Sequence, residues 1–243
     1  MKLSLSVLTA FGLLAGVRAA ASCSANALSC HVSGTVDACC SPTYGLVVLT
    51  QQWAPGYGPS DEFTLHGLWP DTCSGAYGPS SGCDSSRSSS AIASVIRSKD
   101  SALYNRMLTY WPSNTGDNNR FWSHEWTKHG TCVSTLRPTC YGSSYEQYDD
   151  VVDYFKKALD LRDQYDLYGA LNLNGVTPGG SYDADTIRSA IKSAFGAEPK
   201  LDCISGSLSE VGLNFYVRGT SNYEITDVLD NGNCEGFIDY PEK

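Results

Sequence analysis

The chain has 243 residues, and its 26 acidic against 17 basic side chains give a formal net charge of −9. Proteins that hold nucleic acids tightly usually carry a basic face, so this charge argues against a tight binder of polyanions and favours a weak grip on a few nucleotides. Beyond the first twenty residues, no stretch approaches the roughly 18 apolar residues of a membrane span, so we expect no association with membranes.

The first twenty residues have the pattern of a secretory signal peptide. Lys2 precedes an apolar run at 3–17, and small alanines follow at 19–21, as at a cleavage site. A buried N-terminal helix is the alternative. Cleavage would remove two basic residues and leave 15 against 26 acidic ones, a net charge of −11. Residues 21–243 then suit one domain with a substantial core. We expect it outside the cell, or in a vacuole or lysosome-like compartment.

All ten cysteines follow the signal segment. An even number of cysteines in an exported chain predicts five disulfides. A zinc site is disfavoured, because there is no Cys-x-x-Cys pair. Cys39 and Cys40 are adjacent and could bond each other only with strain, so each should pair elsewhere. The residues alone leave the pairing open.

The first predicted element is a buried strand at 45–53, which is rich in apolar and β-branched residues and lies between Pro42 and Pro55. Residues 71–90 are rich in Ser, Gly and Cys, which predicts a loop held by disulfides. Apolar residues recur at helical spacing from Ile92 to Leu108, which predicts a helix that ends before Pro112.

Further helices and strands are predicted in the second half. A helix at about 145–165 and another at 183–195, with Gly196 as its C-cap, precede two strands at 211–218 and 223–228. The stripe of the first helix should pack in the core, and it consists of Tyr148, Val151, Val152, Phe155, Ala158 and Leu159. There is no internal repeat or linker. The fold class predicted is α+β, a single domain with an antiparallel sheet packed with several helices.

Three of the four histidines lie in two aromatic-rich motifs, 63–70 (FTLHGLWP) and 121–130 (FWSHEWTKHG). Histidine is the side chain whose unperturbed pKa lies near neutrality, so this clustering points to proton transfer. On a helix, Glu125 would lie about 40° from His129 and about 60° from Lys128, so the three would share one face. A surface salt bridge between Glu125 and Lys128 is the simpler alternative. His31 lies in a cysteine-rich turn region and is most simply incidental.

A metalloprotease-like zinc motif is the competing interpretation of His124 and Glu125. HExxH needs histidines four residues apart, whereas His124 and His129 are five apart and about 140° around a helix. Lys128 would also repel a cation. The sequence therefore predicts no metal site, and a metal-dependent phosphodiesterase is disfavoured.

Together the two motifs resemble the paired active-site segments of the RNase T2 family, the transferase-type acid ribonucleases, and the surrounding chain looks most like the fungal secreted branch. FTLHGLWP and HEWTKHGTC occur in the family's order, about sixty residues apart, after the strand at 44–53 and the vicinal pair Cys39-Cys40. The resemblance covers nearly all of residues 21–243. It implies five disulfides, namely Cys23–Cys40, Cys30–Cys73, Cys39–Cys140, Cys83–Cys132 and Cys203–Cys234.

The resemblance also implies an endoribonuclease of little base specificity that cleaves single-stranded RNA without metal or cofactor. His129 would be the general base, His66 the general acid, Glu125 and Lys128 would stabilise the pentacoordinate phosphate, and His124 would bind the phosphate. The product would be a 2′,3′-cyclic phosphate, hydrolysed more slowly to a 3′-phosphate. The assignment of base and acid comes from the resemblance, because the residues alone allow the reverse.

Two base-binding sites are expected. Trp69 and Tyr77 could stack a nucleobase while Asp71 accepts a hydrogen bond from an exocyclic amine. The residues that resemble the second base site are Gln52, Pro112, Ser113, Asn114 and Phe121. Trp69 and Phe121 could instead be core residues. We expect a monomer that acts on RNA and not on DNA. The alternative is a secreted RNA-binding cytotoxic or defence protein with secondary catalysis, against which the intact set of catalytic residues argues.

Overall fold

The computed structural model describes residue 23 and residues 27–243. The expected signal peptide, residues 1–20, lies outside the described residues. Within them, no helix is both long enough and apolar enough to cross a membrane.

The centre of the fold is a seven-stranded sheet. Its main path runs β2-β1-β5-β7-β3, and β4 and β6 also pair with β5. The pairing is antiparallel throughout except for one parallel contact between β5 and β7. The strands are β1 (Leu46–Gln52), β2 (Thr64–Asp71), β3 (Gly180–Asp183), β4 (Lys200–Ile204), β5 (Ser207–Arg218), β6 (Asn222–Thr226) and β7 (Phe237–Tyr240).

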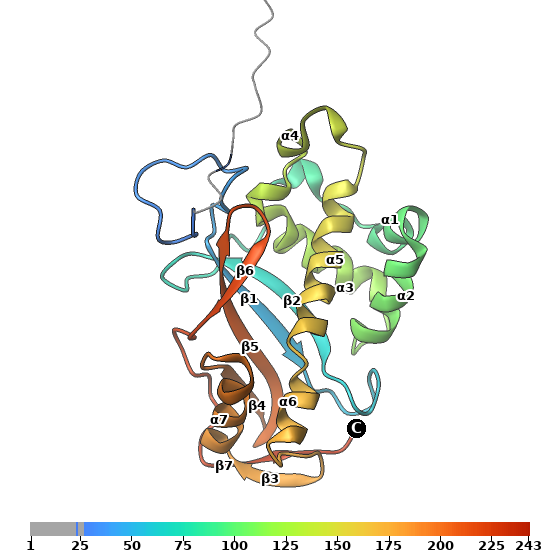
Figure 1. Cartoon of the computed structure of the whole chain (residues 1–243). Helices are drawn as coiled ribbons and strands as arrows, with labels where there is room; N and C mark the ends of the chain where they lie inside the picture. Colours follow the sequence, from blue (N-terminus) through green and yellow to red (C-terminus); the bar gives the residue numbers. More distant parts are fainter. Residues whose placement is uncertain (1–22, 24–26) are drawn as a thin grey trace, which may run out of the picture.

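Helices pack against this sheet and beyond its β2 edge. In Figure 1, α5 runs along one face of the sheet, with α1, α2 and α3 gathered on one side of it and α6 and α7 near β3 and β7. The α-helices are α1 (Ile92–Lys99), α2 (Ser101–Tyr110), α3 (Asn118–Lys128), α4 (Pro138–Tyr141), α5 (Asp149–Gln164), α6 (Leu167–Leu173) and α7 (Ala184–Phe195). Short 3-10 turns are η1 (Ser85–Arg87), η2 (Gly130–Cys132), η3 (Ser134–Leu136) and η4 (Gly142–Ser144).

The core between sheet and helices is aromatic. Trp53, Trp111, Trp122, Trp126 and Tyr154 are all fully buried. Each of the four indole N–H groups donates to a backbone carbonyl oxygen, so these large side chains also fix the loops around them. This packing gives the motif at 121–130 a rigid support, since Trp122 and Trp126 belong to α3.

The predicted fold class is confirmed, and some element boundaries needed correction. The helix expected from Ile92 to Leu108 is two helices, because Asp100 has extended backbone (φ −147°) and its carboxylate accepts a 2.8 Å hydrogen bond from the Leu103 N–H as the N-cap of α2. Leu108 is 41% exposed and does not belong to the core.

The helix expected at 145–165 begins later, at Asp149, because Tyr148 is in the left-handed region with φ 74°. The helix at 183–195 matches α7, and Gly196 adopts φ 87° as its C-cap. The predicted strands correspond to β1, β5 and β6. Not anticipated were β2, which carries the motif at 63–70, and also α4, α6, β3, β4 and β7, most of which are only four or five residues long.

Five disulfides join the pairs that the family resemblance implied. Cys83–Cys132 ties the loop after β2 to η2, just beyond α3. The two motifs therefore approach each other within a covalently closed frame.

Candidate active site

His66 lies at a β-bulge. Thr50 of β1 pairs with Gly67, while the next residue, Gln51, pairs with Leu65, so His66 is the extra residue of β2. A bulge bends its strand and re-aims the side chain of the inserted residue. The His66 carbonyl oxygen is satisfied by the indole N–H of Trp111 at 2.8 Å. The bulge therefore has a stable hydrogen-bonding partner and directs His66 toward α3.

The second motif forms the C-terminal half of α3. Asp117 caps the helix, its carboxylate accepting from the Arg120 N–H at 2.9 Å. The helix ends at Lys128, and His129 is its C-cap, with its N–H still donating to the Glu125 carbonyl oxygen at 3.0 Å. Glu125 is completely buried, whereas His124 is exposed and His129 half-buried. The ionisable side chains at this end of the helix therefore range from fully buried to exposed.

Trp69 connects the two motifs. Its indole Nε1 donates a 2.8 Å hydrogen bond to Oε2 of Glu125, its ring stacks on His129 with 5.2 Å between centroids, and its edge meets His66 at 4.9 Å. Gly67 allows this approach, because a Cβ there would lie 2.1 Å from Trp69 Nε1 and 2.2 Å from Glu125 Oε2. The side chains of His66, Trp69, Glu125 and His129 therefore pack together in one cluster, with Gly67 at its centre.

The cluster opens into a cavity of about 320 Å³. It is lined by His66, Trp69, Pro70, Asp71, Tyr77, Gly78, Pro79, Ser80, His124, Glu125, Lys128 and His129. All four expected catalytic residues, the expected phosphate-binding histidine and the first expected base-binding set thus meet in one place.

The histidines of the cavity have pKa values shifted in opposite directions. Burial, with the nearby charges of Lys128 and the other histidines, lowers the pKa of His129 to about 3. For His66, burial also lowers the pKa, but the hydrogen bond and negative charge of Glu210 outweigh it and the pKa is raised above 6.5. His124 has a pKa lowered by burial and by Lys128. At weakly acidic pH the cavity therefore holds a protonated imidazole at His66 beside a neutral one at His129.

Two carboxyl groups of the cavity have raised pKa values. Burial raises the pKa of Glu125 to about 7, against the opposing effects of His66, the Trp69 hydrogen bond and Lys128. Burial likewise raises the pKa of Asp71 to about 6. Within the described part of the chain, Oε1 of Glu125 is buried without a hydrogen-bond partner. A protonated Glu125 therefore has one oxygen that can donate to a ligand in the cavity.

The sequence predicted that His124 and His129 lie too far apart around a helix to share a metal ion, and this geometric argument is wrong. The rings of His124 and His129 nonetheless lie near each other, with 6.3 Å between their centroids. One potential ligand atom each from His124, Glu125 and His129 lies within 4.8 Å of the others. What still argues against a cation is the chemistry, since Lys128 lies beside these groups. Metal-free catalysis therefore stays a prediction.

The expected second base site is only partly assembled near the cavity. Phe121 lies beside His66, with 5.8 Å between ring centroids. Gln52 is buried and its Nε2 donates to the Leu65 carbonyl oxygen at 3.1 Å. Ser113 is buried and bonded to Thr115 and Asn118, while Asn114 is exposed and Pro112 half-buried. Phe121 is the member of this set whose ring lies against His66.

Sequence reasoning missed Glu210. Its Oε1 lies 2.6 Å from Nδ1 of His66, although the two residues are 144 positions apart. Glu210 precedes the predicted strand at 211–218, and nothing in its local sequence distinguishes it from a solvent-facing acid. Only the order of strands in the sheet brings it to His66.

The site on this mixed sheet thus brings together histidines, a lysine and a buried carboxyl group, the kinds of side chain that acid–base chemistry uses. The model of the Ribonuclease T2 family matches residues 38–228. The chain is 64% identical to ribonuclease Rh of Rhizopus niveus over 234 residues, which cover 96% of this chain and 98% of that protein. It is 39% identical to ribonuclease T2 of Aspergillus oryzae, covering 85% and 78% of the two chains.

Solved structures agree with the sequence comparisons. The crystal structure of Actibind, described as a T2 ribonuclease, superposes with a TM-score of 0.86 at 36% identity, covering 91% of this chain and 98% of that one. Ribonuclease MC1 from bitter gourd seeds superposes with a TM-score of 0.55 at 28% identity, covering 81% and 100%. The chain belongs to the Ribonuclease T2 family and is an endoribonuclease.

Proposed function

We propose that the enzyme cleaves single-stranded RNA by transphosphorylation to a 2′,3′-cyclic phosphate, followed by slower hydrolysis to a 3′-phosphate. The observation that carries this proposal is the pair of histidines in one cavity whose pKa values are shifted in opposite directions. RNA supplies its own nucleophile, the ribose 2′-OH. The protein must then remove one proton, supply another and stabilise the crowded phosphate.

In the first step, neutral His129 takes the proton of the 2′-OH as the oxygen attacks phosphorus. Protonated His66 gives its proton to the departing 5′-oxygen, so the P–O5′ bond breaks as the P–O2′ bond forms. In the second step water replaces the 5′-hydroxyl and the two histidines exchange roles. The raised pKa of His66 and the lowered pKa of His129 suit these roles and disfavour the reverse assignment.

The remaining groups act on the phosphate. Lys128 contributes positive charge beside the cavity, and His124 lies at its exposed rim. Below pH 7 Glu125 is largely protonated, so it does not repel the phosphate, and its free oxygen can donate to a non-bridging oxygen. Each group is expected to act without metal or cofactor.

The base of the nucleotide 5′ to the scissile bond is proposed to bind among Trp69, Asp71 and Tyr77. Tyr77 is 80% exposed, Asp71 is buried, and both line the cavity beside Trp69. Above a pH of about 6, ionised Asp71 can accept a hydrogen bond from an exocyclic amine. Crystal structures of ribonuclease MC1 variants contain 5′-GMP or 5′-UMP, which supports nucleotide binding on this fold.

Export is proposed from the signal-like segment and the five disulfides, which persist in oxidising compartments. The mature enzyme would act as a monomer. Recovery of the protein from the medium with an N-terminus near residue 21 tests export, and its mass in solution tests the monomer.

Dinucleoside phosphates with product identification test the chemistry. We expect a 2′,3′-cyclic phosphate first, a 3′-phosphate later, full activity in EDTA, and no cleavage when the 2′-OH is replaced by hydrogen. Loss of activity in EDTA, or cleavage of the 2′-deoxy substrate, would overturn the mechanism.

A further inference from the structure

Glu210 reaches His66 across the sheet. The two residues lie on β5 and β2, and β1 runs between these strands, so their backbones are separated by two strand spacings, roughly 9.5 Å. Glu210 stands opposite Gln52 in the register of β5 and β1, and His66 projects from the bulge at Thr50 and Gln51. The bulge thus brings the imidazole within 2.6 Å of a carboxylate from a strand that is not its neighbour.

This contact determines which nitrogen of His66 carries a hydrogen. An ionised carboxylate only accepts hydrogen bonds, so Nδ1 must be the donor toward Oε1 of Glu210. Nε2 is then the nitrogen left for the substrate. In the protonated ring Nε2–H can be given to a leaving oxygen, and in the neutral ring Nε2 can take a proton from water. Both steps that the proposed function assigns to His66 use this nitrogen.

The contact also sets the charge of His66. Only 25% of the side-chain surface of Glu210 is exposed, so solvent screens its charge only partly. The other charged or titratable groups that act on or are affected by His66 belong to α3 and its C-cap, namely His124, Glu125, Lys128 and His129. Among these, Lys128 opposes protonation of His66, and Glu125 is itself largely protonated at weakly acidic pH. Glu210 is the group whose hydrogen bond and charge outweigh burial.

We propose that Glu210 is a positioning residue for the reaction, which fixes the ring orientation and tautomer of His66 and keeps this histidine protonated as the general acid. The inference rests on the proposed function. Glu210 acts through its hydrogen bond to an imidazole that lies on another strand.

The central test is Glu210→Gln, which keeps the size of the side chain and removes its charge. On a dinucleoside phosphate we expect a loss in kcat/KM of roughly 10- to 100-fold, below the full value of a general acid. The high-pH limb of the pH profile, where His66 loses its proton, should move to lower pH. An unchanged limb would overturn the proposal.

A second substrate separates positioning from simple structural damage. A nucleoside 3′-(4-nitrophenyl phosphate) has a leaving group that departs without being protonated. Glu210→Gln should cleave it at nearly the normal rate, and so should His66→Ala. An equal loss on both substrates would mean that Glu210 supports the fold or the base and not the acid, and would overturn the proposal.

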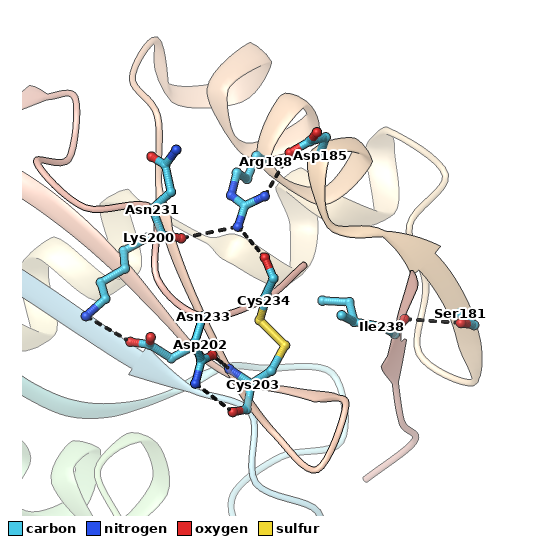
Figure 2. Close-up of a disulfide and its surroundings, with 10 residues drawn as sticks. All are labelled: Ser181, Asp185, Arg188, Lys200, Asp202, Cys203, Asn231, Asn233, Cys234 and Ile238. Atoms are coloured by element: carbon cyan, nitrogen blue, oxygen red, sulfur yellow. Dashed lines mark hydrogen bonds and ion pairs between the residues drawn. A yellow bond between two sulfur atoms is a disulfide. The ribbon is translucent and has the colours of Figure 1, made fainter. Parts of the chain in front are cut away.

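Asp202 provides the matched control. It faces Glu210 across the β4–β5 ladder and is paired with Lys200 at 3.3 Å, on the far side of Glu210 from His66. Figure 2 shows this pair beside the Cys203–Cys234 disulfide, which ties β4 to the segment between β6 and β7. Asp202→Asn removes the same charge from the same surface without touching His66. It should leave the position of the high-pH limb unchanged, and an equal shift would show that only net charge matters.

A double variant completes the test. Because Glu210 acts through His66, His66→Ala with Glu210→Gln should be no worse than His66→Ala alone. A further tenfold loss in the double variant would overturn the proposal. Near-normal activity of His66→Ala on a dinucleoside phosphate would instead defeat the proposed function, so the two failures are distinguishable.

Discussion

The indole of Trp69 bridges the two active-site motifs, because its Nε1 donates to Oε2 of Glu125 at 2.8 Å while its ring stacks on His129. The same side chain therefore meets the buried carboxyl group and the proposed base. Its expected role in binding a nucleobase is additional to this internal one.

Trp69→Phe separates these roles. Phenylalanine keeps an aromatic face against His129 but removes the N–H that now lowers the pKa of Glu125. We expect the pKa of Glu125 to rise further and kcat/KM to fall by roughly 10-fold, about the worth of one hydrogen bond between neutral groups. Trp69→Ala should lose more, since it also removes stacking. A pH profile of Trp69→Phe identical to that of the parent would show that the hydrogen bond is not used.

Gly67→Ala tests the close approach at the centre of the site. The new Cβ would overlap Trp69 Nε1 and Glu125 Oε2, at 2.1 and 2.2 Å, so Trp69 or α3 must move. Such overpacking typically lowers the free energy of unfolding by roughly 1–3 kcal/mol. Activity should fall by more than the loss of folded protein accounts for, because the catalytic groups are displaced. Gly212→Ala is the control, because its Cβ would meet the Lys200 Cβ at 3.3 Å and needs only a small shift. Equal effects at the two glycines would contradict this picture.

The pH dependence of kcat/KM follows from the two histidines. His129 must be neutral, so activity rises as the pH passes about 3, and His66 must be protonated, so activity falls above its raised pKa. The expected bell is broad and centred on the acid side of neutrality. His66→Ala and His129→Ala should each lose roughly 10²- to 10⁴-fold and remove their own limb. Glu125→Gln and Lys128→Ala should lose less. A profile still rising at high pH would point to another base.

The sequence predicted the chemistry of the site better than its geometry. The two motifs and the cysteine series were enough for the family, and hydrophobic spacing found β1, α5 and α7. The apolar spacing from Ile92 to Leu108 continues through Asp100 and therefore did not reveal the break between α1 and α2. The approach of Glu210 to His66 depends on strand order, which local spacing does not encode.

Glu125→Gln should stabilise the fold while it impairs catalysis. The folded-state pKa of Glu125 is raised from 4.5 to about 7, so the folded protein binds this proton more tightly than the unfolded chain. Its contribution to stability is present below pH 4.5 and is lost as the pH rises through about 7. The shift corresponds to at most about 3 kcal/mol. Glutamine is neutral at every pH, so the Tm of Glu125→Gln should exceed that of the parent above pH 7 and match it near pH 4.5. Thermal unfolding at the two pH values measures this difference. If the Tm difference between the parent and Glu125→Gln is the same at both pH values, Glu125 is not protonated in the folded enzyme.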